Sequence, residues 1–137
     1  MVQAETLRLY KMTVATWENQ PEFISLFNEG SAGIFVEVYT TDEIYNYVNN
    51  GTRPHDIEGN PYLAFLSAYK SKTKPGRIRS GAGGGSGDTV VRAKVHHPGT
   101  EARNFDTAIA AKIGPYQQHR MNIAMKKARV DSNHAYS

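Results

Sequence analysis

The first 28 residues place apolar side chains at helical spacing. These side chains recur at steps of three and four residues: Leu7, Tyr10, Val14 and Trp17. The pattern predicts an amphipathic helix, and the apolar residues of 23–27 predict its continuation. Gln20-Pro21 predicts a division into two helices, because a residue before proline avoids helical dihedrals and proline suits a first helical turn. The tract GSAG at residues 30–33 predicts the end of the helical part.

Three later segments read as strands. Residues 34–39 (IFVEVY) are rich in β-branched and aromatic side chains, residues 61–69 form an apolar run, and residues 88–97 (DTVVRAKVHH) alternate apolar with polar. Alternation with period two is typical of a half-buried strand. Residues 40–50 fit either a strand or a short helix around residues 42–47.

The end of the chain returns to helical spacing. Asn104 is placed to cap the first turn, and Asp106 lies near the positive end of the helix dipole. Phe105, Ile109 and Ile113 form a four-residue stripe. Gly114-Pro115 predicts a break, followed by a second helix to about Arg129. Residues 131–137 are expected to be a frayed tail.

Residues 69–88 have no hydrophobic period and contain the glycine-serine tract GAGGGSG. We expect a flexible, exposed, basic hairpin extension between two strands. The predicted fold is therefore α+β, with one domain over residues 1–137. A small, mainly antiparallel sheet with a long hairpin packs against N-terminal and C-terminal helices.

Composition narrows the classes of protein. The chain has 137 residues, 39% of them hydrophobic, and no cysteine, which excludes disulfides and thiolate chemistry. No apolar run reaches the roughly 18 residues of a membrane helix, and the N-terminus MVQAETLRLYK lacks the apolar stretch of a signal peptide. We therefore expect no membrane partner.

The first and second parts of the chain carry opposite net charges. Residues 1–58 hold three basic and nine acidic residues, whereas residues 59–137 hold thirteen basic and four acidic ones. This division fits contact between opposite faces of two copies, contact with phosphate, or simply two solvated faces.

Catalytic patterns are sparse. A histidine metal site is one hypothesis, because His55, His96 and His97 could converge if the turns that carry them are neighbours. Adjacent strand residues point to opposite faces, however, and no HExxH spacing occurs. The chain also lacks a GxSxG nucleophile elbow, and GAGGGSG lacks the GK[ST] ending of a phosphate-binding loop. We expect no enzymatic activity, no cofactor and no metal.

A basic nucleic-acid-binding module is a second hypothesis. Between Gly59 and Gly87 the chain has five basic residues and no acidic one: Lys70, Lys72, Lys74, Arg77 and Arg79. Such a loop can follow phosphates without reading bases, but it equally suits a solvated hairpin.

Two Gly-Thr stretches carry a resemblance to a known family. The chain runs from a strand into YVNNGTRPHDI, through an apolar strand and a variable hairpin, and then from a strand ending in VHHPGTEARNF into a closing helix. This order resembles the small neck and tail-completion proteins of tailed bacteriophages, which include minor tail and head–tail joining proteins of lambda-like phages. The resemblance covers about residues 34–128.

The resemblance implies a non-enzymatic structural protein of the virion. Such a subunit would be assembled in the host cytoplasm and form a homo-oligomeric ring in the neck. The ring would join the portal or connector to the tail-tube or terminator proteins and let DNA pass. A tail-terminator ring subunit is the alternative.

The resemblance also suggests site residues. The residues expected at turns near subunit contacts are Tyr47, Asn50, Gly51, Thr52, Arg53, Pro54, His55, His97, Pro98, Gly99, Thr100, Arg103 and Phe105. Arg53 and Arg103 would offer planar guanidinium groups to carboxylates of a neighbour. The five basic hairpin residues would contact channel DNA or a partner protein.

Overall fold

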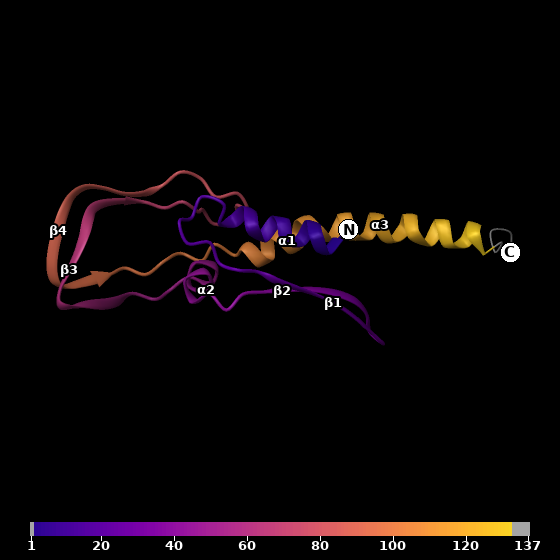
Figure 1. The fold of residues 1–137 in the computed structure, drawn as a ribbon, viewed down its shortest axis with the longest axis horizontal. Coiled ribbons are helices and arrows are strands. Elements are labelled where there is room, and N and C mark those ends of the chain that lie inside the picture. The colour runs from indigo at the N-terminus through magenta and orange to yellow at the C-terminus, as the bar shows by residue number, and fades with distance from the viewer. Residues whose placement is uncertain (1, 133–137) are drawn as a thin grey trace.

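A computed structural model describes residues 2–132 and shows an elongated α+β protein (Figure 1). A small body lies in the middle, one long ribbon projects from one end, and a hairpin and a helix project from the other. The elements are α1 (Val2–Thr13), β1 (Ile24–Gly30), β2 (Gly33–Tyr39), α2 (Glu43–Asn50), β3 (His55–Lys70), β4 (Gly84–His97) and α3 (Phe105–Asp131). The strands pair antiparallel, as predicted, in two separate ribbons, β1–β2 and β3–β4.

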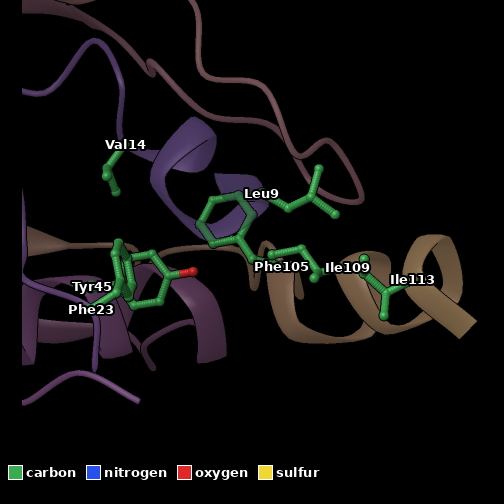
Figure 2. Close-up of a cluster of buried hydrophobic side chains, with 7 residues drawn as sticks. All are labelled: Leu9, Val14, Phe23, Tyr45, Phe105, Ile109 and Ile113. Carbon is green, nitrogen blue, oxygen red and sulfur yellow. The ribbon is translucent and has the colours of Figure 1, made fainter. Parts of the chain in front are cut away.

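The core is small and joins the two ends of the chain. Its buried apolar residues are Leu9, Val14, Phe23, Tyr45, Phe105, Ile109 and Ile113 (Figure 2). Tyr45 is central, since its ring lies 4.9 Å from that of Phe23 and 5.7 Å from that of Phe105. The stripe predicted for the closing helix is therefore confirmed as its core face.

The second helix predicted after Pro21 is wrong, because residues 24–30 form β1. Ile24 pairs with Tyr39 and Gly30 with Gly33, so β1 and β2 make a tight hairpin. A short apolar run does not distinguish helix from strand by its spacing, and pairing with the predicted strand at 34–39 decides the outcome.

Residues 40–50, for which the sequence fitted either a strand or a short helix, contain helix α2. Asp42 caps this helix, because its carboxylate accepts a hydrogen bond from the N–H of Tyr45 at 2.7 Å.

The β3–β4 ribbon is longer than predicted and bends back on itself. Register shifts between Glu58 and Leu63 and between Leu66 and Ala68 interrupt the pairing. Such irregularities bend a ribbon and increase its twist. The ribbon leaves the body beside α2, curves, and returns toward α1 (Figure 1).

Residues 71–83, between these strands, lie against the body, so the expected free extension is wrong. The N–H of Ser80 donates to the carbonyl of Met12 at 3.2 Å, and Ile78 packs against the core. Gly84 to Gly87 of the glycine-serine tract belong to β4. Polar hydrogen bonds hold this segment against the body. It has too few apolar residues to form a hydrophobic period, so its docking could not be predicted from the sequence.

The predicted break at Gly114-Pro115 is also wrong, since α3 is continuous through Pro115. Proline removes the hydrogen bond to the carbonyl four residues earlier, here that of Ala111. Ala111 is exposed, so water can satisfy that carbonyl. Beyond Ile113 none of the described residues of α3 is buried. Of the expected tail, residues 133–137 lie outside the described residues.

Candidate functional site: the paired Gly-Thr turns

The two Gly-Thr stretches meet side by side, at the base of the β3–β4 ribbon. The N–H of Thr52 donates to the carbonyl of Thr100 at 2.9 Å, and the N–H of Thr100 donates to the carbonyl of Thr52 at 3.1 Å. The hydroxyl oxygen of Thr52 also accepts from the N–H of Thr100 at 2.9 Å. The similar turns thus form one bridged joint, and Thr52 contributes through its side chain as well as its backbone.

Both glycines are required by this crossing. Gly51 has φ +77° and Gly99 has φ +88°, in the region that favours glycine. A Cβ atom on Gly51 would lie 2.7 Å from the carbonyl oxygen of Thr100, and one on Gly99 would overlap the carbonyl oxygen of Thr52. Each glycine therefore gives space to the threonine of the other turn.

The histidines separate as strand alternation predicts. His55 and His97 are opposite one another in the register, with ring centroids 5.0 Å apart. His97 Nδ1 accepts from the N–H of Gly99 at 3.0 Å, and His55 Nδ1 donates to the carbonyl of Arg53 at 2.9 Å. These rings hold the two turns in shape. Within residues 2–132 no group of three or more histidine and carboxylate side chains could hold a metal ion.

His96 faces away from this pair and joins an exposed charge cluster. Its Nδ1 lies 2.8 Å from Asp56 Oδ1, and the Lys94 ammonium lies 2.9 Å from Asp56 Oδ2 and 3.6 Å from Glu58 Oε1. The hydrogen bonds from His96 and Lys94 lower the pKa of Asp56, and Asp56 raises the pKa of Lys94. The cluster links β3 to β4 on the ribbon's solvent side.

Asn49 connects the joint to α3, a role that the sequence did not reveal. Its side-chain oxygen accepts from the N–H groups of Phe105 at 2.7 Å and Asp106 at 3.4 Å, and its carbonyl accepts from the N–H of Asn104 at 3.0 Å. Asn104 was expected to cap this helix. It instead has φ 51° and no side-chain cap hydrogen bond. The cap of α3 therefore comes from Asn49, at the end of α2.

Arg103 is buried, and its expected role toward a neighbour's carboxylate is wrong. Only 9% of the residue is exposed. Its guanidinium donates to the hydroxyl of Thr73 at 3.1 Å, the hydroxyl of Ser71 at 3.2 Å and the carbonyl of Glu101 at 2.7 Å. Arg103 therefore fastens the segment 71–83 to the start of α3.

The other predicted residues divide between the interior and the surface. Phe105 is fully buried in the core, so it supports the fold and does not contact a neighbour. The exposed ones are Tyr47, Asn50, Arg53, Pro54, His55 and Pro98, while Gly51, Thr52, His97, Gly99 and Thr100 are half-buried. The exposed group forms the outer surface of the joint.

Two of the five predicted basic residues lie together in one surface hollow. Arg77 and Arg79 line a surface hollow together with Lys112 of α3, Met12 and Ile78. Lys70, Lys72 and Lys74 lie outside this hollow. Lys112 was not among the candidates, because only the docking of residues 71–83 brings it near the arginines.

The chain matches no protein-family model, and neither the curated proteins nor the solved structures contain a significant match to it. Among the described residues, no helix is both long and apolar enough to cross a membrane.

Proposed function

We propose that this chain is a structural subunit of a tailed-bacteriophage virion. In this proposal it forms a homo-oligomeric ring in the neck that joins the head to the tail and lets DNA pass. The order of strands around the two Gly-Thr turns supports the family. The large accessible surface of the chain is the observation that supports an oligomer.

The accessible surface of the chain is 10205 Å². A compact monomer of this mass would expose about 7,100 Å². The difference, about 3,000 Å², is more than the roughly 2,400 Å² that a ring subunit would bury with two neighbours and one stacked partner, at about 800 Å² a contact. Such an excess is expected of a protein whose projecting elements become covered on assembly.

The projecting elements are themselves unsuited to isolation. A lone two-stranded hairpin is at best marginally stable in water. Phe35 of β2 is 52% exposed, and Met125 of α3 is 61% exposed. Large exposed apolar surfaces are typical of interaction sites.

The paired turns give this architecture a rigid joint. The backbone bridge between Thr52 and Thr100 fixes the base of the ribbon, and Asn49 fixes the start of α3 relative to α2. The projecting ribbon and helix therefore keep a defined angle to each other. In a ring, that angle sets the rotation between successive copies, because a fixed heterologous contact closes only at one angle.

Native mass spectrometry and negative-stain electron microscopy of the purified protein test the oligomer. We expect a symmetric ring at micromolar concentration, or in the presence of the proteins that flank it in the neck. A protein that remains monomeric under both conditions would refute the proposal. Antibody labelling of virions then tests the location, since the label should lie at the head–tail junction.

The hollow formed by Arg77, Arg79 and Lys112 favours a contact with DNA in the channel. Duplex binding by the ring should weaken steeply with salt and weaken further in the variant Arg77→Gln/Arg79→Gln. The matched variant Lys72→Gln/Lys74→Gln removes the same charge outside the hollow. Equal affinities for the two variants would contradict a DNA role for the hollow and leave the ring unaffected.

A further inference from the structure

The hairpin formed by β1 and β2, here called the arm, is apolar on both of its faces. Its register places Ile24, Leu26, Phe35 and Tyr39 on the outer face, and Phe27, Ile34, Val36 and Val38 on the inner one. The root of the inner face is half-buried at Val36 and Val38, and the outer apolar residues are all exposed. Strands that are apolar on both faces are typical of sheets covered on both sides. The outer face therefore lacks its cover in the single chain.

The arm is also acidic. From Met12 to Thr52 the chain contains no lysine or arginine, and the arm carries Glu29 and Glu37. Glu37 is opposite Leu26 on the outer face, whereas Glu29 is opposite Ile34 on the inner face near the tip. A surface that covers the arm should be apolar with basic residues at its margins.

The distal half of α3, residues 115–131, has this composition. It carries four basic residues and one acidic residue. Large exposed apolar residues lie along it: Tyr116, Met121, Ile123, Met125 and Val130. It projects beyond the body (Figure 1).

One stripe of this helix continues from the body outward. A surface groove of about 460 Å³ lies between β2 and α3 and is lined on the helix by Ile113, Gly114 and Gln117. Steps of three and four residues carry the same face on to Met121, Ala124 and Ala128. Lys127 and Arg129 are adjacent to Ala128 in sequence, so they lie about 100° to either side of the stripe. From Met121 to Ala128 the stripe is therefore apolar, with a cation on each margin.

The two surfaces also match in length. The seven residues of β1 span about 23 Å at about 3.3 Å per residue. The distal half of α3 spans about 25 Å at about 1.5 Å per residue. One arm can therefore cover one distal helix along its whole length.

We propose that the outer face of the arm packs along the distal half of α3 in a second copy of this chain. The second copy is favoured as the occupant because the arm and the helix are complementary in charge, apolar character and length. The contact joins two different surfaces, so each copy gives one arm and receives another, which is the arrangement that closes into a ring. This inference rests on the proposed ring and names its subunit interface.

Charge reversal tests the pairing. Glu37→Lys reverses the charge on the outer face of the arm, and Lys127→Glu/Arg129→Glu reverses the charges on the margins of the helix stripe. We expect each variant alone to associate at least about tenfold more weakly than the wild type, since like charges then face each other across the contact. An equimolar mixture of the two should associate again, because each arm then meets a helix of opposite charge. The control Glu18→Lys makes the same charge change outside the arm and should associate normally.

Cysteine cross-linking tests the proximity directly, because the chain has no native cysteine. Leu26→Cys and a mass-tagged Met125→Cys are mixed as folded proteins and oxidised with copper phenanthroline. The expected product is a disulfide between one tagged and one untagged chain. Replacing Leu26→Cys by Tyr62→Cys, a cysteine at an exposed site on the ribbon, should abolish the product.

The outcomes separate the interface from the ring. A wild-type oligomer that both charge reversals leave intact, with no arm-to-helix cross-link, would overturn this interface and leave the proposed ring standing. A wild type that is monomeric at every concentration and with every neck protein would overturn the ring itself. Reduced association of both reversed variants, recovery in their mixture and the heterologous cross-link would together establish the interface.

Discussion

Replacing Asn49 by alanine should destabilise the protein more than replacing Asn104 by glycine. The side-chain oxygen of Asn49 accepts from the buried N–H of Phe105 at 2.7 Å and from that of Asp106 at 3.4 Å. Loss of a helix cap costs about 0.5–2 kcal/mol, and an unsatisfied buried N–H costs about 1–3 kcal/mol. The two costs describe overlapping interactions, so we expect the free energy of unfolding to fall by about 2 kcal/mol.

Urea unfolding followed by circular dichroism measures this loss. With a slope of about 2 kcal/mol per molar urea, the midpoint of Asn49→Ala should fall by about 1 M. All variants are compared at one subunit concentration, because association adds a term that depends on concentration. Asn49→Asp keeps the oxygen that accepts both hydrogen bonds and places a negative charge at the helix N-terminus, so it should lose less than about 1 kcal/mol.

Asn104→Gly is the matched control on the other candidate cap. The side chain of Asn104 makes no cap hydrogen bond, and its φ of 51° suits glycine. We expect a change within about 0.5 kcal/mol. A loss at Asn104→Gly equal to that at Asn49→Ala would refute the assignment of the cap to Asn49.

Three further predictions concern the joint and the ribbon. Gly99→Ala should lower the unfolding free energy by at least about 2 kcal/mol through its clash with Thr52, whereas Gly76→Ala, which has open space, should cost about 1 kcal/mol of backbone strain. Arg103→Met should speed amide exchange at Gly76, whose N–H donates to the carbonyl of Arg103, and unchanged exchange would contradict the fastening role. Because the folded pKa of Asp56 lies below the ordinary 3.8, its stabilisation is present above pH 3.8 and is lost as pH falls through the lowered pKa. The melting-temperature difference between wild type and Asp56→Asn should therefore vanish in acid, and a difference that persists there would contradict the pairing.

Local patterns predicted the parts of the fold that depend on neighbouring residues. The spacing of Phe105, Ile109 and Ile113 identified the core face of α3, and the alternation of VVRAKV identified β4. The β1 half of the arm was predicted as helix because ISLF, taken alone, fits both the helical and the strand period. Only pairing with β2 selects the strand.

The interactions of the joint could not be predicted because their partners are distant in sequence. Asn49 and Phe105 are 56 residues apart, and Arg103 and Thr73 are 30 apart. The similarity of the two Gly-Thr stretches did indicate that the turns belong together. That similarity could not show that Arg103 is buried and Arg53 exposed, because Arg103 is buried by residues 71–83, whose packing against the body the sequence did not predict.

The core that joins Leu9 to Phe105 and Ile109 also sets the order of events during synthesis. The core residues of α1 cannot be buried until α3, about 100 residues later in the chain, has been synthesised. Contacts between residues so far apart in sequence slow folding. Throughout that interval the nascent chain carries an uncovered apolar hairpin, which makes it prone to aggregate. The yield of soluble protein should therefore depend on translation rate and temperature more than on the stability of the finished subunit.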